Sequence, residues 1–262
     1  MTDSAAKLLT LPLTPEGLAA QSVGFEWRGP QAYLAPTRAT PLAKALMGKT
    51  NCGLYVLLCG SLVWAARRLE FVANTKPLLQ MAEALLCYQD DPRYFAENGP
   101  SHLTSPLPPA QEAVETLCYE TSAIFMETPG RHSSRPPVQA VENVVSVTRH
   151  ILGPDWQKAF RTWVTDSIAT LNAVAPNPHQ DFRSRYDFGS AEDWDAYKRL
   201  NMGRPLPLDV LVPGESHDPG ELSRRFAAFL AEVRPAENPY LVPAEAMLAL
   251  GFVGQPYQPR AH

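Results

Sequence analysis

The chain has 262 residues, of which 45% are hydrophobic and 19% are charged, and its formal net charge is −4. This length permits a sizeable core in one large domain or two small ones. The acidic balance argues against a general nucleic-acid binder, because such proteins usually carry a basic face. Proline occurs 26 times, about twice the average share, so we expect many helices to begin at Pro and to be joined by long irregular connections.

The first 40 residues predict an irregular arm. Four prolines interrupt them, and a fifth, Pro41, suits the start of a helix. Within this arm, the sequence VGFEWRG (residues 23–29) is compatible with a short strand. We expect the arm to pack over a helical body. The N-terminus carries an acid early and lacks an apolar stretch, so we expect no signal peptide.

The sequence ALMGKT (residues 45–50) ends like a phosphate-binding loop. The first glycine of that motif would have to stand where the chain has Ala43, and the motif should follow a strand. The preceding residues instead predict a helix that begins at Pro41. We therefore interpret Gly48 as a bend or interruption of a helix and Lys49 as a solvated side chain.

Residues 52–66 form the longest apolar run, 15 residues without a charge. A membrane-spanning helix needs roughly 20 such residues, whereas a helix that is apolar on all sides is typical of a large core. Gly53, Gly60 and Ser61 would lie near one face and let another helix approach closely. The run therefore predicts a central core helix.

All four cysteines occur in apolar contexts that resemble helices, and none forms a CxxC pair; they are Cys52, Cys59, Cys87 and Cys118. Free cysteines of this kind are commonly buried, and reduced thiols are typical of the cytoplasm. We expect four buried free thiols and a cytoplasmic protein.

Helical spacing of apolar residues recurs along the rest of the chain. It predicts helices at about 77–88 and 109–126, then an antiparallel helical hairpin whose arms contain Val138–Leu152 and Trp156–Leu171. Three further helices are predicted, one capped by Ser190, one beginning at Asp218-Pro219, and one from Pro243 to Gly251. Residues 204–217 read as extended, a strand or an arm.

Strand signals are few, so the sequence predicts a mostly α fold with at most a little β. We expect an irregular multi-helix bundle with Pro-rich loops and extended arms, organised as a single helical domain over residues 1–262. The segment 176–190 is the one candidate for a domain boundary.

The most chemically varied stretch is HQDFRSRYDFG (residues 179–189). A His-x-Asp pair can contribute to a metal site, but no second segment supplies further ligands at matching spacing. We therefore predict no catalytic residue, no metal site and no cofactor. If the chain does have a pocket between helices, the residues to test first are His150, His179, Asp181, Arg183 and Arg185.

Charge is distributed unevenly along the chain. Residues 1–76 carry a net charge of +4, residues 77–127 carry −7, and the remainder carries −1. Several acids of the middle segment have spacings that would place them on one broad outward side of the helix at 109–126. The sequence predicts an acidic face made of Glu83, Asp90, Asp91, Glu97, Glu112, Glu115, Glu120 and Glu127.

An acidic face without catalytic motifs favours a protein that binds another, basic protein, such as an immunity or antitoxin-type inhibitor. Aromatic residues that look exposed in loops would supply anchors: Trp27, Tyr33, Tyr94, Tyr186, Tyr240 and Tyr257. We expect neither nucleic acid nor membrane as a partner. The alternatives are a helical enzyme or small-ligand binder with a pocket between helices, and an assembly subunit with the 52–66 helix at its interface.

Overall fold

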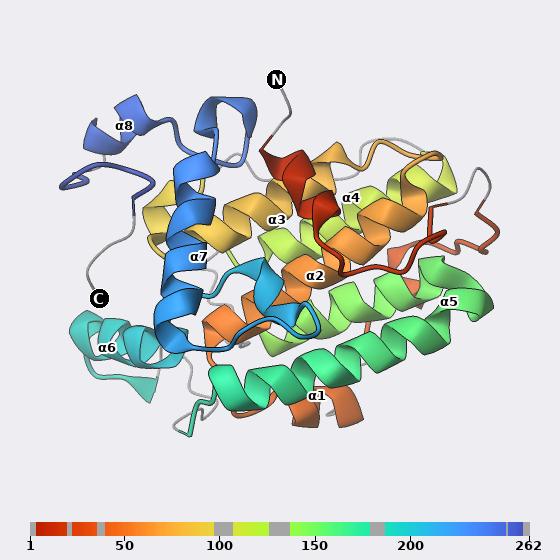
Figure 1. Cartoon of the computed structure of the whole chain (residues 1–262), viewed down its shortest axis with the longest axis horizontal. Coiled ribbons are helices and arrows are strands. Elements are labelled where there is room, and N and C mark those ends of the chain that lie inside the picture. The colour runs from red at the N-terminus through yellow and green to blue at the C-terminus, as the bar shows by residue number, and fades with distance from the viewer. Residues whose placement is uncertain are drawn as a thin grey trace.

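The computed structural model describes residues 4–19, 23–35, 40–96, 107–125, 137–178, 187–249 and 251–258. Within these residues the backbone is helical or irregular, and its β pairing is confined to two isolated bridges, Lys49 with Pro176 and Phe95 with Leu241. The mostly α prediction is therefore confirmed. In Figure 1, α2 runs through the middle of the bundle and α7 crosses one end of it.

The longer helices are α2 (Asn51–Leu69), α3 (Lys76–Tyr88), α4 (Pro109–Ser122), α5 (Val138–Val174), α6 (Ala191–Met202) and α7 (Pro219–Glu232). Two helices of one to two turns, α1 (Pro41–Leu46) and α8 (Ala244–Ala249), accompany them. Short 3₁₀ turns lie between, namely η1 (Ala5–Thr10), η2 (Pro30–Ala32), η3 (Pro92–Tyr94), η5 (Leu208–Leu211) and η6 (Pro235–Glu237).

Helix α2 is the core of the molecule, as its apolar run predicts. Thr50 caps it by accepting a hydrogen bond from the Gly53 amide, and every residue from Cys52 to Ala66 is buried. By length and composition this helix could cross a membrane, but 94% of its apolar window is buried inside the protein. The chain itself covers the helix, so it is not the open interface that an assembly role would need.

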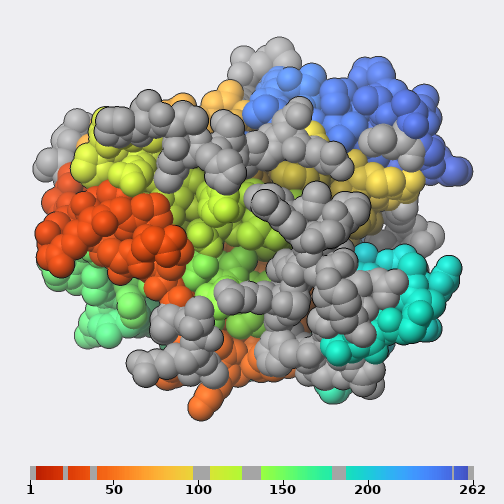
Figure 2. All heavy atoms as spheres, turned by 180° about the vertical axis from the view of Figure 1, so that it is seen from behind, coloured from red at the N-terminus to blue at the C-terminus, as the bar shows by residue number. Residues whose placement is uncertain are grey.

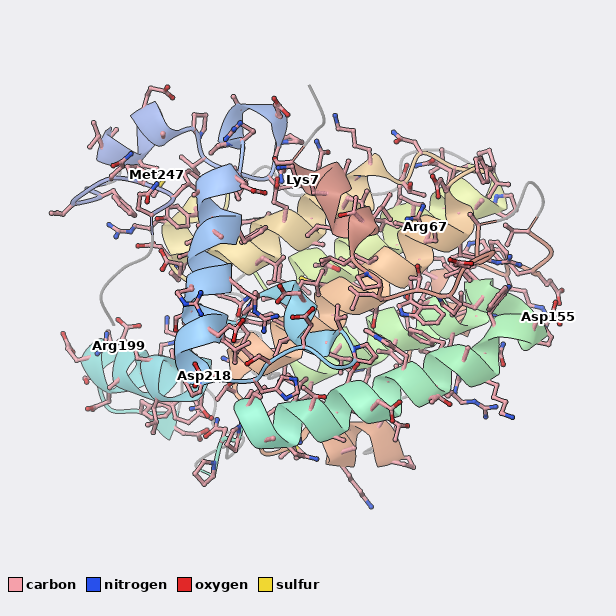
Figure 3. The ribbon with its side chains drawn as sticks, in the orientation of Figure 1. Lys7, Arg67, Asp155, Arg199, Asp218 and Met247 are labelled. Carbon is pink, nitrogen blue, oxygen red and sulfur yellow. The ribbon has the colours of Figure 1, made fainter. Side chains whose placement is uncertain are left out.

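The hairpin prediction is also confirmed, although the helical hydrogen-bond pattern runs through both arms of α5. Gly153 has φ 69° and ψ 175°, which reverses the chain ahead of Pro154. In Figure 3, Asp155 lies at the tip of this turn. Both arms pack on α2. In the first arm, Thr148 donates a hydrogen bond to the Ser61 carbonyl. The second arm carries side chains that lie against Gly53 and Gly60.

The prediction that the Lys49 side chain is solvated is wrong. α1 ends at Leu46, and Gly48 lies in the turn that follows, with φ 73°, but Lys49 is only 3% exposed. Its Nζ donates hydrogen bonds to the carbonyls of Ala45 at 2.9 Å and Met47 at 3.3 Å. Carbonyls at a helix C-terminus lack amide partners and carry partial negative charge, so the ammonium group caps α1 instead of reaching solvent. Burial lowers the pKa of Lys49.

The N-terminal arm packs over the bundle as predicted, but residues 23–29 form no strand. They run as an extended segment without β pairing, and side chains hold them in place. Tyr33 stacks on His150 of α5 with ring centroids 3.7 Å apart, and a nitrogen of His150, Nε2, lies 2.6 Å from the Glu26 carbonyl oxygen. Figure 2 shows this red-orange segment on the outer surface beside the green hairpin.

In the C-terminal third, helices begin at the predicted capping residues. Ser190 caps α6 by accepting from the Asp193 amide, and Asp218 caps α7 by accepting from two amides. Residues 204–217 are not a strand, since they contain η5. All four cysteines are buried and free, as predicted.

Candidate functional site

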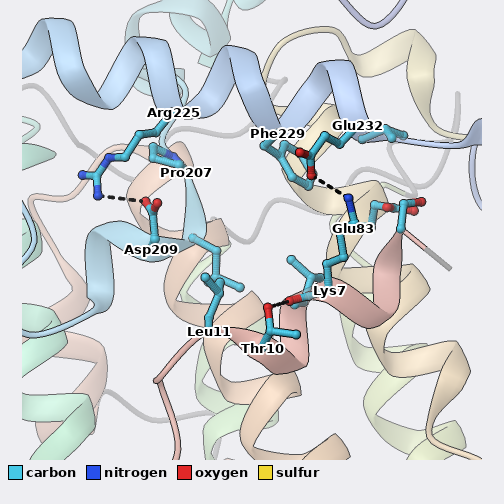
Figure 4. Close-up of a pocket in the computed structure, with 13 residues that line it drawn as sticks. Lys7, Thr10, Leu11, Glu83, Pro207, Asp209, Arg225, Phe229 and Glu232 are labelled. Carbon is cyan, nitrogen blue, oxygen red and sulfur yellow. Dashed lines mark hydrogen bonds and ion pairs between the residues drawn. The ribbon is translucent and has the colours of Figure 1, made fainter. Parts of the chain in front are cut away.

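A pocket of about 260 Å³ lies between η1, η5 and α7. Figure 4 shows it bordered by two ion pairs on opposite sides, with apolar side chains between them. Thirteen residues line it: Ser4, Lys7, Leu8, Thr10, Leu11, Glu83, Pro207, Leu208, Asp209, Arg225, Phe229, Glu232 and Val233. It therefore joins the N-terminal arm to the C-terminal third of the chain over the core helices.

Helix α7 supplies one wall because it is amphipathic. Its buried stripe, which contains Leu222, Phe226 and Leu230, faces the core. The residues Arg225, Phe229 and Glu232 are four and three positions apart, which puts them on a neighbouring face of the same helix. The pocket is thus built on the flank of a helix whose other side is fixed by the core.

The ion pair at the rim joins the N-terminal arm to α7. Lys7 Nζ lies 2.9 Å from a carboxylate oxygen of Glu232, and both side chains are at least half exposed. Exposed pairs of this kind contribute little to stability because water and salt screen them. The ion pair therefore borders one side of the pocket but holds the two segments together only weakly.

The second ion pair is better enclosed and is shared among three side chains. Arg225 Nη1 lies 2.7 Å from Glu215 and 3.4 Å from Asp209, while its Nη2 donates to the Ser216 carbonyl at 2.6 Å. Asp209 Oδ1 is buried and accepts no hydrogen bond from the described residues. Burial raises the pKa of Asp209, and the nearby Arg225 opposes that rise.

Glu83 is the most deeply placed charged group of the pocket lining, at 1% exposure. Its Oε2 accepts a hydrogen bond from Asn238 Nδ2 at 2.9 Å, and the same nitrogen donates to the Gln80 carbonyl. A buried acid stabilised in this way is part of the interior, so Glu83 does not belong to an exposed acidic face.

Two other members of the predicted acidic face are also buried. Asp91 holds Arg93 through two hydrogen bonds of 3.0 and 2.7 Å and accepts from the Arg93 amide, and Asp90 is buried beside it. Asp91 is the N-cap of the 3₁₀ turn η3, a position at which aspartate is preferred, and this role draws its side chain inward. Glu97 and Glu127 lie outside the described residues.

The three remaining acids are on α4 and do not behave alike. Glu112 and Glu115 are half-buried on the outer side. Glu120 turns inward, where it accepts a hydrogen bond from Asn143 Nδ2 of α5, and burial raises its pKa. Of the described members of the predicted face, Glu112 and Glu115 remain as partly exposed acids on α4.

The described residues do not test the predicted alternative pocket, because His150 is the one member of it that they include. His150 is occupied in the stack with Tyr33, and His179, Asp181, Arg183 and Arg185 lie outside the described residues. Several of the predicted aromatic anchors are internal. Tyr94, Tyr240 and Tyr257 are buried, Trp27 and Tyr33 are half-buried, and Tyr186 is outside the described part.

Sequence reasoning did not find the pocket, because its charged residues come from four distant segments. The available signal was the polar flank of α7 beside its apolar stripe. Across the part of the chain that the structure describes, no group of three or more His, Cys, Asp or Glu side chains is placed to hold a metal ion. Comparison with protein-family models, with curated proteins and with solved structures finds no match.

Proposed function

We propose that the chain is a small-molecule-binding protein and that its ligand occupies the pocket between η1, η5 and α7. The observation that carries this proposal is Asp209, a half-buried carboxylate in the lining of a concave site, whose Oδ1 accepts no hydrogen bond from the described residues. Buried polar groups in native proteins are normally satisfied. A ligand that pairs with the Asp209 carboxylate would satisfy this group and explain why an acid lines the pocket.

The shape and composition of the pocket support the same proposal. Ligand sites are concave, mostly apolar, and carry a small number of placed polar groups. Here Leu8, Leu11, Leu208 and Phe229 supply apolar walls. Its volume corresponds to about nine water molecules at roughly 30 Å³ each, which suits a small organic molecule better than a large cofactor.

Filling the pocket tests the proposal. Leu11 lines it without being fully buried, so Leu11→Trp should occupy the space while the fold persists. Phe71→Trp is the matched control, because Phe71 is exposed and is not in the lining. Ligand-observed NMR against a mixture of small fragments should show binding to wild type and to Phe71→Trp and loss of binding to Leu11→Trp. Equal binding to all three would contradict the proposal.

A second candidate function, binding of a basic protein in the cytoplasm, is favoured by one feature of α4. Tyr119 is 41% exposed and lies four residues along the helix from Glu115 and seven from Glu112, which places all three on the same face. Tyrosine is a common anchor residue at protein interfaces. The four free cysteines suit a reducing compartment.

This second proposal is tested by capture from native lysate with two baits. The wild-type chain should retain one basic protein that is released as salt rises, because charge–charge attraction is screened. The double variant Glu112→Lys with Glu115→Lys should lose that protein. Retention of the same proteins by both baits would contradict a role for this face.

A further inference from the structure

We infer that the pocket ligand is a small organic cation, a protonated amine with an apolar substituent, whose ammonium group pairs with Asp209. This inference rests on the proposed small-molecule function and names the class of ligand. It follows from comparing how well each charged group of the pocket is already satisfied.

The two cations of the lining are held by short contacts. Lys7 Nζ is 2.9 Å from Glu232. Arg225 reaches Glu215 at 2.7 Å and the Ser216 carbonyl at 2.6 Å. An anionic ligand would have to compete with these contacts for either cation, and it would gain little from groups that are already neutralised.

The carboxylate of Asp209 is less well paired than these two cations. Its ion-pair contact is the longer one, 3.4 Å, and it shares Arg225 Nη1 with Glu215. Oδ1 is buried without a hydrogen bond from the described residues, yet the side chain as a whole keeps 27% of its surface exposed. A carboxylate that is partly removed from water and poorly hydrogen-bonded is costly, and an ammonium group offers it both charge and up to three donors.

The charge balance of the pocket points the same way. Its lining contains two cations, Lys7 and Arg225, and three carboxylates, those of Glu83, Asp209 and Glu232. Glu215 adds a fourth carboxylate beside Arg225. Like charges in a partly dehydrated site disfavour a further anion, whereas they favour a cation.

The apolar side of the pocket determines which substituent the amine carries. Leu8, Leu11 and Leu208 offer aliphatic surface, and the ring of Phe229 can face either an alkyl group or the cation. Arg225 Nε is a buried donor without a hydrogen-bond partner among the described residues.

The test uses three probes with one carbon skeleton: 3-methylbutylamine, 3-methylbutan-1-ol and 3-methylbutanoate. Affinities are measured by NMR titration with wild type, Asp209→Asn and the control Asp195→Asn, whose side chain lies on α6 in an ion pair with Lys198. A hydrogen bond to a charged partner predicts that wild type and the control bind the amine about tenfold more tightly than the alcohol. Asp209→Asn should bind amine and alcohol alike, and the carboxylate should bind weakest throughout.

The outcomes separate the two proposals. If none of the probes binds wild type, the pocket is not a ligand site and both proposals fall. If the alcohol binds as well as the amine, or if the carboxylate binds best, the pocket remains a ligand site and the cation class is overturned. Should Asp209→Asn not fold, wild type alone decides, because amine affinity should fall as Asp209 is protonated at low pH while alcohol affinity stays constant. A pH-independent amine affinity would overturn the inference.

Discussion

Gly60 of α2 packs directly against the indole ring of Trp163 in α5, so closely that a Cβ at position 60 would lie 2.6 Å from the ring atom Cζ2. Trp163 is itself fixed, because it stacks on Phe160 and contacts Trp64. The missing side chain is therefore what allows the second arm of the hairpin to reach the core helix.

This contact predicts that Gly60→Ala destabilises the protein. Alanine is the better helix former by about 1 kcal/mol, but forcing a methyl group into a packed core typically costs about 1–3 kcal/mol, and a stacked indole has little room to move. We expect a net loss of about 1–2 kcal/mol in the free energy of unfolding, measured by urea denaturation. Gly189→Ala is the control, since a Cβ there meets nothing within 4 Å. A stabilised Gly60→Ala would show that the ring can shift.

The cysteines give a second prediction, on reactivity. All four are buried, and burial raises the pKa of each thiol, that of Cys118 to about 12. Because the thiolate is the reactive form, the native protein should release almost no thionitrobenzoate from Ellman's reagent at neutral pH. In denaturant, four thiols per chain should react. Rapid reaction of a native thiol would indicate local opening of the helix that carries it.

Glu120 and Glu115 of α4 give a third prediction, because they face different surroundings. Glu120 accepts from Asn143 Nδ2, and the Oδ1 of Asn143 in turn accepts from the Ala35 amide of the N-terminal arm. Glu120→Lys would place a cation against a donor in a partly buried network and should cost about 1–3 kcal/mol. Glu115 is only half-buried and carries no such hydrogen bond in the described contacts, so Glu115→Lys should change the free energy of unfolding by no more than about 0.5 kcal/mol, the range typical of surface substitutions. Equally small effects in urea denaturation would show that both side chains face solvent.

Local sequence patterns were sufficient to predict most of the fold. The apolar run of α2 and the link at Gly153-Pro154 act within a few residues, so their meaning does not depend on distant segments. Lys49 was predicted wrongly for the converse reason. The carbonyls that it caps are close in sequence, but its burial depends on other parts of the chain, as the bridge to Pro176 shows.

The candidate site was much less predictable than the fold. Its charged groups, Lys7, Glu83, Asp209, Arg225 and Glu232, come from segments that are far apart in the sequence and lie together only in the folded chain. The predicted acidic face placed every acid of residues 77–127 on the surface. Glu83 and Asp91 are instead buried, and they are held by hydrogen bonds that sequence spacing does not reveal.

Asp209 gives the last prediction, on the pH dependence of stability. Because burial raises its pKa above the ordinary value, the folded chain binds more protons than the unfolded chain between those two pKa values. The stability tied to this carboxyl is then fully present below the unfolded pKa and is lost as pH rises through the folded one. Asn cannot titrate, so the free energy of unfolding of Asp209→Asn, relative to wild type, should be higher at about pH 7 than at about pH 4.

A control of opposite sign is available in Glu26, whose pKa is lowered chiefly by its hydrogen bond from Arg28. Its stabilising contribution is lost as pH falls, so Glu26→Gln should approach wild type at acidic pH. Urea denaturation of the three proteins across this pH range measures both trends. If Asp209→Asn is destabilised by the same amount at every pH, its charge has no cost in the folded chain. The carboxylate would then be an ordinary structural partner of Arg225, and the reason to expect a cation beside it would disappear.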